Sequence, residues 1–205
     1  MLEIETPHGP ARAHLHMVNS PRGALVLGHG AGGGVGAPDL VAATEAAREE
    51  GFTVALVEQP YRVAGRRSPA PAKQLDAAWI AVVTRLRKRE IGGLPLVAGG
   101  RSLGARVACR TADATGTVAV LCLAFPLEPP HRPATPPKSR LDELDAVRVP
   151  VLVVQGDGDP FGRPPPGPSR EVVTVRGNHG LKSDLDGVAA AVRAWLAAVV
   201  GAPVR

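Results

Sequence analysis

Short apolar runs recur along the chain and alternate with stretches of helical character, and this alternation constrains the fold more than any other feature. Each run ends in turn-forming or polar residues, as buried parallel strands do. The runs are residues 24–27, 53–57, 95–98, 117–123, 151–154 and 171–175. The helical stretches are residues 39–50, 72–90, 102–112 and 183–200. This order predicts an α/β domain with a mainly parallel sheet and helices on both faces.

The segments outside this alternation complete the expected fold. Residues 6–18 are predicted to add an antiparallel hairpin at one edge of the sheet. The last helix is predicted to begin with a capping pair, Ser183 and Asp186. Residues 126–150 and 162–168 are rich in proline, which favours surface loops over regular elements. No change of composition marks a linker, so we expect a single domain over residues 1–205.

The composition predicts a globular protein without a nucleic-acid or membrane partner. Hydrophobic residues make up 44% of the chain and aromatic residues only 3%, so the core should consist mainly of Ala, Val and Leu. The net charge is +5, but the basic residues are scattered, and we expect no nucleic-acid partner. No stretch approaches the ~20 apolar residues that span a bilayer, so no membrane partner is expected.

The two cysteines favour a reducing compartment. Cys109 and Cys122 fall inside a predicted helix and a predicted strand, where thiols usually behave as small buried apolar groups. The N-terminus has no continuous apolar segment of the kind that secretory signals contain. We therefore expect a cytoplasmic location and no disulfide framework. An oligomeric state does not follow from the sequence.

The most informative motif is G-x-S-x-G at residues 100–104. A predicted buried strand ends just before it and a predicted helix begins at Ser102, which is the context of a nucleophile elbow. In such an elbow a strained turn lifts a serine above the sheet, and the glycines avoid collisions with neighbouring backbone. The alternative is a tight turn in which Ser102 only caps the helix. The strand and helix context favours Ser102 as a catalytic nucleophile.

A catalytic serine needs a base and an acid, which in this class of elbow follow it in the order Ser, acid, His. Only His131 and His179 follow Ser102; His131 lies among prolines, whereas His179 follows the last predicted strand in a glycine-flanked loop. His179 is therefore the expected base. Asp157 and Asp159 compete for the acid, and we favour Asp159 because it lies further from the strand end. Asp157 is then expected to bond its own backbone in a turn.

The glycine-rich segment 29–34 follows the first predicted parallel strand. It lacks the Lys-[Ser/Thr] of a phosphate-binding P-loop and a convincing dinucleotide fingerprint, so we expect no cofactor. An oxyanion loop fits better, with the backbone N–H groups of Ala31 (Gly32 as reserve) and Leu103 facing the developing charge. His29 is then an orienting structural histidine. His14 and His16 share one strand face without further ligands nearby, and no metal site is predicted.

Arg66 and Arg67 follow the strand at 53–57 in a Pro- and Gly-flanked loop. That loop is expected at the carboxyl edge of the sheet, where active sites of open α/β sheets lie. One reading is that at least one guanidinium faces the cleft and favours anionic substrates. The other, simpler reading is two solvated surface arginines.

Six motifs in fixed order resemble a family of small α/β-hydrolase-like proteins. They are HGAGGG (29–34), EQPYRVAGRR (58–67), GGRSLGAR (99–106), FPLEPP (125–130), VQGDGDPFG (154–162) and GNHGLK (177–182). The branch they resemble includes a vertebrate testis-expressed protein and a hydrolase-like subunit of a chromatin acetyltransferase complex, and is similar more distantly to dienelactone hydrolases. The resemblance implies the α/β-hydrolase fold, with Ser102, Asp159 and His179 at the triad positions. Dienelactone hydrolases use cysteine where this chain has Ser102, so their substrate is not carried over.

These observations predict a serine hydrolase of esterase or thioesterase type. The segment between the strands at 117–123 and 151–154 is too short for a multi-helix lid, so the cleft should be shallow and the partner a small-molecule acyl substrate. Because fold does not determine function, a binding or scaffold protein that retains the fold is the alternative. The presence of Ser, Asp and His in the expected order argues against it.

Overall fold

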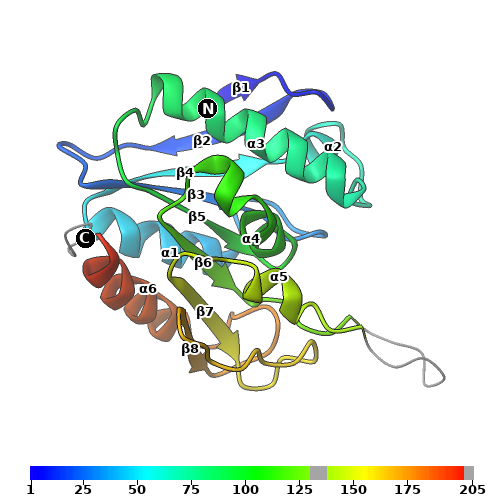
Figure 1. The fold of residues 1–205 in the computed structure, drawn as a ribbon, viewed down its shortest axis with the longest axis vertical. Coiled ribbons are helices and arrows are strands. Elements are labelled where there is room, and N and C mark those ends of the chain that lie inside the picture. The colour runs from blue at the N-terminus through cyan, green and yellow to red at the C-terminus, as the bar shows by residue number, and fades with distance from the viewer. Residues whose placement is uncertain (130–137, 201–205) are drawn as a thin grey trace.

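The computed structural model describes residues 1–129 and 138–200. In these residues, eight strands form one sheet (Figure 1). The strand order is β1-β2-β4-β3-β5-β6-β7-β8. Neighbouring strands from β4 to β8 in this order pair in parallel. These strands are β3 (Gly23–Gly28), β4 (Phe52–Glu58), β5 (Leu96–Arg101), β6 (Ala119–Leu123), β7 (Val151–Gly156) and β8 (Arg170–Val175). The predicted parallel sheet is confirmed.

Helices cover both faces of the sheet, as expected (Figure 1). On one face α1 (Pro38–Glu49) packs against α6 (Leu185–Val199), and on the other α3 (Ala72–Arg89) packs against α4 (Leu103–Thr115). Two short helices, α2 (Pro60–Val63) and α5 (Leu141–Asp145), lie in the connections after β4 and before β7. Each helix in residues 1–129 and 138–200 is too short or too polar to cross a membrane.

The central strands are buried on both sides, which explains their nearly continuous apolar sequences. In β3, Leu25 and Leu27 pack toward α1 and α6, whereas Ala24 and Val26 pack toward α3 and α4. Both core clusters consist mainly of Ala, Val and Leu, as the composition predicted.

Three local predictions need correction. The hairpin lies earlier than predicted, with strands β1 (Leu2–Ile4) and β2 (Ala11–His16), because the Pro- and Gly-containing segment between them forms the turn. The helix α6 is capped by Asp184, which accepts from Gly187 N–H at 3.1 Å, and not by Ser183. Residues 126–150 are not loop throughout, because the proline-free sequence of α5 forms a helical turn with acidic residues at its start.

The connections diverge at the carboxyl ends of β3 and β5, which are adjacent strands. The chain leaves β3 toward α1 on one face, and it leaves β5 toward α4 on the other. Such a divergence leaves a crevice at the carboxyl edge of an open parallel sheet, which is where ligands of α/β proteins bind. The segment that begins at Ser102 starts there.

Candidate active site

Ser102 occupies a sharp turn between β5 and α4. Its backbone torsions are φ 52° and ψ −106°, a conformation that costs a non-glycine residue about 1–3 kcal/mol. The turn is held because Ser102 N–H donates to Leu123 O in β6 at 2.9 Å. A Cβ at Gly100 would come within 2.5 Å of Gly28 O, so the flanking position requires glycine. This is the strained strand-to-helix turn that the G-x-S-x-G motif predicted.

The Ser102 hydroxyl does not cap the helix. Ser102 occupies the N-cap position of α4, but its side chain makes no capping hydrogen bond to the helix. Instead Ser102 Oγ lies 2.9 Å from His179 Nε2, 77 residues away in the sequence. The hydroxyl is therefore directed at an imidazole above the carboxyl edge of the sheet.

His179 is bonded to Asp159 through its other ring nitrogen. His179 Nδ1 lies 2.8 Å from Asp159 Oδ2, and the Asp159 side chain is only 1% exposed. Gln155 Nε2 donates to Asp159 Oδ2 at 2.8 Å, and Phe161 N–H donates to Asp159 Oδ1 at 2.9 Å. An ionised Asp159 accepts these bonds and keeps the His179 proton on Nδ1, which leaves Nε2 free to accept from Ser102.

Asp157 has a different environment from Asp159. It is exposed, and its Oδ1 accepts from Gly177 N–H at 2.8 Å. The partner is thus a residue 20 positions further along the chain, and not the neighbouring backbone that we expected. Because Gly177 precedes the segment that carries His179, Asp157 ties β7 to that segment without reaching the imidazole.

The loop after β3 lies beside the serine. A Cβ added to Gly30 would be 3.6 Å from Ser102 Cβ, so Ala31, the next residue, is close to the elbow. Tyr61 Oη donates to the Ala31 carbonyl at 3.0 Å, which orients the peptide that joins Ala31 to Gly32. Leu103 is the first residue of α4, and its N–H has no carbonyl partner within the helix. The two N–H groups that the sequence suggested for an oxyanion hole therefore belong to the loop beside Ser102 and to the residue that follows it.

His29 has the orienting role that the sequence suggested. It is buried, its Nδ1 lies 2.8 Å from Gly30 O, and Gln59 N–H donates to its Nε2 at 3.1 Å. A neutral ring with its proton on Nδ1 satisfies both partners, whereas a cationic ring would direct an Nε2 proton at the Gln59 N–H. Burial lowers the pKa of His29 below 6.5, with smaller opposing effects from Gly30 and Glu58.

This environment predicts a loss of stability on mild acidification. Because the folded-state pKa of His29 lies below its unfolded value of 6.5, the unfolded chain binds more protons as the pH falls below 6.5. The free energy of unfolding should then decrease more between pH 7.5 and 5 for the native protein than for His29→Gln. Urea unfolding at the two pH values measures this difference, and parallel pH profiles for the two proteins would contradict it.

The remaining candidate residues lie apart from this constellation. Arg66 and Arg67 are both exposed, and Arg66 borders a cavity of about 80 Å³ whose lining contains none of Ser102, Asp159 and His179. His131 lies outside the described residues. In the described part of the chain, no three His, Cys, Asp or Glu side chains gather in a way that could hold a metal ion.

Four side chains that contact the site were not found by reading the sequence. Phe161 packs against His179 with ring centroids 4.3 Å apart, and Gln155 donates to Asp159. Arg101 and Asp39 form an ion pair, Nε to Oδ2 at 3.0 Å, next to the elbow. The sequence offered a reason to single out only two of them. Arg101 precedes Ser102 in the G-x-S-x-G motif, and Phe161 follows Asp159 by two residues.

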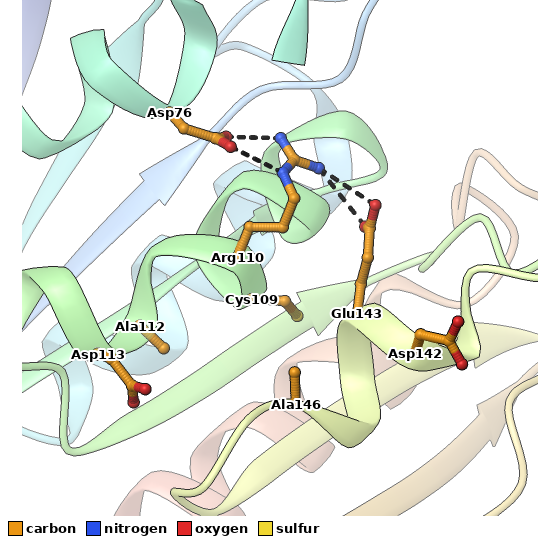
Figure 2. A pocket seen from close by; sticks show the side chains of 8 residues that line it. All are labelled: Asp76, Cys109, Arg110, Ala112, Asp113, Asp142, Glu143 and Ala146. Carbon is orange, nitrogen blue, oxygen red and sulfur yellow. Dashed lines mark hydrogen bonds and ion pairs between the residues drawn. The ribbon is translucent and has the colours of Figure 1, made fainter. Parts of the chain in front are cut away.

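A cavity of about 490 Å³ opens beside the constellation. Its walls come from the glycine-rich loop at 32–36, the start of α1, Arg101, Gly180 and Lys182. The loop at 32–36 follows Ala31, Arg101 precedes Ser102 and Gly180 follows His179 in the chain. A second cavity of about 490 Å³ lies between α3, α4 and α5, and its lining contains no residue next to Ala31, Ser102 or His179 in the chain (Figure 2).

Sequence comparison matches residues 21–172 to the family model described as "Alpha/beta hydrolase domain". No curated protein matches the chain by sequence. Among solved structures, Est1E from Butyrivibrio proteoclasticus is similar, with a TM-score of 0.78 and 17% identity, covering 98% of this chain and 99% of that one. An α/β serine hydrolase without a lid from Xanthomonas campestris has a TM-score of 0.71 and 20% identity, covering 95% and 93%.

Dienelactone hydrolase from Anabaena variabilis is similar over the whole chain, with a TM-score of 0.72 and 15% identity, covering 100% of this chain and 97% of that one. At these identities the likenesses concern the fold, and they confirm the α/β-hydrolase fold that the motifs implied. The described residues between β6 and β7 contain one five-residue helix, α5, in agreement with the expected minimal lid.

Proposed function

Because the chain belongs to the α/β-hydrolase domain family, we propose that it is a serine hydrolase that cleaves small acyl esters or thioesters. One observation carries the proposal. Ser102 Oγ, on a strained elbow, lies 2.9 Å from His179 Nε2, and His179 Nδ1 lies 2.8 Å from a buried Asp159 carboxylate. A hydroxyl, an imidazole and a carboxylate in this order are the groups that acyl transfer to serine requires.

In the acylation step, Ser102 Oγ attacks the carbonyl carbon of the substrate while His179 Nε2 takes the hydroxyl proton. The imidazole becomes cationic, and the Asp159 carboxylate stabilises that charge through the Nδ1 proton. The tetrahedral intermediate then collapses, and His179 Nε2 returns the proton to the departing alcohol or thiol. The products of this half-reaction are the Ser102 acyl ester and the leaving group.

In the second half-reaction, water hydrolyses the Ser102 acyl ester. His179 Nε2 takes a proton from a water molecule, whose oxygen attacks the acyl carbon. When this second intermediate collapses, the proton returns to Ser102 Oγ and the carboxylic acid is released. The His179 imidazole thus acts as a base and then as an acid in each half-reaction.

The negative charge on each tetrahedral intermediate needs donors that are already in position. We assign this role to the N–H groups of Ala31 and Leu103, with Gly32 as the reserve. Two features support the assignment. Tyr61 Oη holds the Ala31 carbonyl, which fixes the peptide that carries the Gly32 N–H and restrains Ala31 beside it, and Leu103 N–H is at the positive end of the α4 dipole, next to Ser102.

The surroundings favour small acyl groups. The cavity beside the constellation is about 490 Å³, within the range of small-molecule pockets, and in the described residues α5 is the only helix between β6 and β7. Long acyl chains would find little apolar surface to cover them. The acyl and leaving groups themselves are open to assay.

A fluorophosphonate probe tests the proposal directly, because it phosphonylates only an activated serine. We expect stoichiometric labelling of the native protein and none of Ser102→Ala, together with faster hydrolysis of acetyl and butyryl than of dodecanoyl p-nitrophenyl esters. A folded native protein that is neither labelled nor active would refute the proposal. It would favour the alternative of a scaffold that retains the fold.

We also propose a branch of the family for this chain. The six motifs support membership of the branch that includes a testis-expressed protein and a subunit of a chromatin acetyltransferase complex.

Cys109 and Cys122 are both buried free thiols, 3.6 Å apart between sulfur atoms, which supports a reducing, cytoplasmic location.

Arg66 and Arg67 provide a separate, smaller test of substrate preference. If either guanidinium attracts anionic substrates, Arg66→Ala and Arg67→Ala should lower kcat/KM for esters that carry a carboxylate by more than for neutral esters. The expected ratio is a few-fold, because both side chains are exposed and solvent screens their charges. Equal losses on neutral and anionic esters would leave them as ordinary surface residues.

A further inference from the structure

Arg101 is the residue between Gly100 and Ser102, at the end of β5, and its side chain lies within the protein. It is 18% exposed, and its guanidinium contacts segments from three parts of the chain. Nε forms an ion pair with Asp39 Oδ2 at 3.0 Å, and Nη2 donates to the backbone carbonyl of His179 at 2.9 Å. Nη1 lies so close to Gly30 that an added Cβ would come within 2.7 Å of it.

The partner carboxylate is well placed to fix this guanidinium. Asp39 is fully buried at the start of α1, where its Oδ1 accepts from Leu40 N–H at 3.0 Å. Burial raises the pKa of Asp39, and the charge of Arg101 acts in the opposite direction. A buried carboxylate is costly without a counter-charge, so each member of this pair depends on the other.

Each contact of Arg101 corresponds to a different part of the proposed machinery. The His179 carbonyl belongs to the residue whose ring accepts from Ser102, so holding this peptide limits how far the imidazole can move. Gly30 precedes Ala31 in the oxyanion loop. Asp39 lies in the first turn of α1, to which that loop leads. Arg101 itself is bonded covalently to Ser102, so the serine, the base and the oxyanion loop meet at one side chain.

We propose that Arg101, fixed by Asp39, is a positioning residue that holds the His179 segment and the oxyanion loop in register with Ser102. The inference rests on the proposed function, since it explains how the serine hydrolase machinery is kept aligned. A planar guanidinium suits this role, because its donors point in several fixed directions at once. A lysine ammonium can replace the ion pair, but it does not reproduce the fork that reaches both Asp39 and His179 O.

Arg110 provides a matched control. It lies on α4 and is 17% exposed, as buried as Arg101, and it donates to Asp76 from Nε and Nη2 at 2.9 and 2.6 Å. Figure 2 shows its guanidinium between Asp76 and Glu143, at the cavity between α3, α4 and α5. Replacing Arg110 therefore removes a comparable ion pair without removing a contact to Gly30 or His179.

The kinetic test compares Arg101→Met, Arg101→Lys and Arg110→Met on a short p-nitrophenyl ester. We expect Arg101→Met to lower kcat about 10²-fold with little change in KM, since misplacing reacting groups by about 1 Å has an effect of that size. The rate of fluorophosphonate labelling should fall in parallel. Arg101→Lys should retain more activity than Arg101→Met, and Arg110→Met should keep kcat within about threefold of the native value.

A double variant separates positioning from stability. Asp39→Asn combined with Arg101→Met removes the buried uncompensated charge, so its melting temperature should recover relative to Arg101→Met alone. Its kcat should stay low, because the contacts with His179 O and Gly30 are still missing. Recovery of kcat together with stability, or equal losses of kcat in Arg101→Met and Arg110→Met, would overturn the positioning role.

Hydrogen exchange tests the inference independently of activity. In Arg101→Met, peptides covering residues 29–37 and 176–184 should exchange faster than in the native protein, and in Arg110→Met they should not. Unchanged exchange in both variants would overturn the inference even if the enzyme is active. If the native protein fails to react with fluorophosphonate, only the proposed function fails, and the exchange result still decides whether Arg101 orders these loops.

Discussion

Replacing Ser102 by alanine should abolish the hydrolysis of short p-nitrophenyl esters and leave the protein folded. The substitution removes the attacking oxygen, and the loss of a triad nucleophile costs about 10⁴ to 10⁶-fold in kcat. Alanine adopts the same strained backbone as serine and removes only one side-chain hydrogen bond, the one to His179. Steady-state kinetics, with far-ultraviolet circular dichroism and a thermal melt of the same preparation, measure both parts of this expectation.

The size of the residual activity decides what Ser102 does. A variant with native stability that keeps more than about a tenth of native kcat would show that another group attacks the carbonyl. His179→Ala gives a second view of the same step, because it should slow acylation to a similar extent while leaving the Ser102 hydroxyl in place. Comparable losses in the two variants are the signature of residues that act as a unit.

Replacing Asp159 by asparagine should lower kcat by about 10³ to 10⁴-fold. Asp159 Oδ2 accepts from both His179 Nδ1 and Gln155 Nε2, and Oδ1 accepts from Phe161 N–H. An amide has only one oxygen, so one of its N–H groups must face a donor. When it faces His179 Nδ1, the imidazole is pushed toward the tautomer with its proton on Nε2, which is unable to accept from Ser102.

Asp157→Asn is the matched control two residues away. Its amide oxygen can still accept from Gly177 N–H, as Asp157 Oδ1 does at 2.8 Å, so kcat should fall tenfold or less. Both variants change one carboxylate to an amide in the same loop, and their melting temperatures show whether either is disturbed. The reverse ranking of kcat would move the acid to Asp157 and leave the roles of Ser102 and His179 unchanged.

The sequence alone was enough to predict the sheet, its covering helices and the elbow. Buried parallel strands must be apolar on both faces, so β3 to β7 appear as short continuous apolar runs that local reading detects. The elbow requires glycine at residue 100 because its Cβ would collide with Gly28 O, and such a backbone constraint leaves a direct trace in the residue type. Where local backbone geometry allows only one residue type, that residue type can be used to predict the geometry from the sequence.

The tertiary structure decided which polar side chains meet. Nothing near Asp39 or Gln155 in the sequence indicates that one pairs with Arg101 and the other with Asp159, because the residues concerned belong to different elements or to the two ends of a tight loop. Similarly, the choice of Asp184 over Ser183 as the cap of α6 depends on which side chain reaches Gly187 N–H. Apolar burial is specified by pattern and composition, whereas a hydrogen bond or ion pair depends on distances and directions that are set only when the elements pack together.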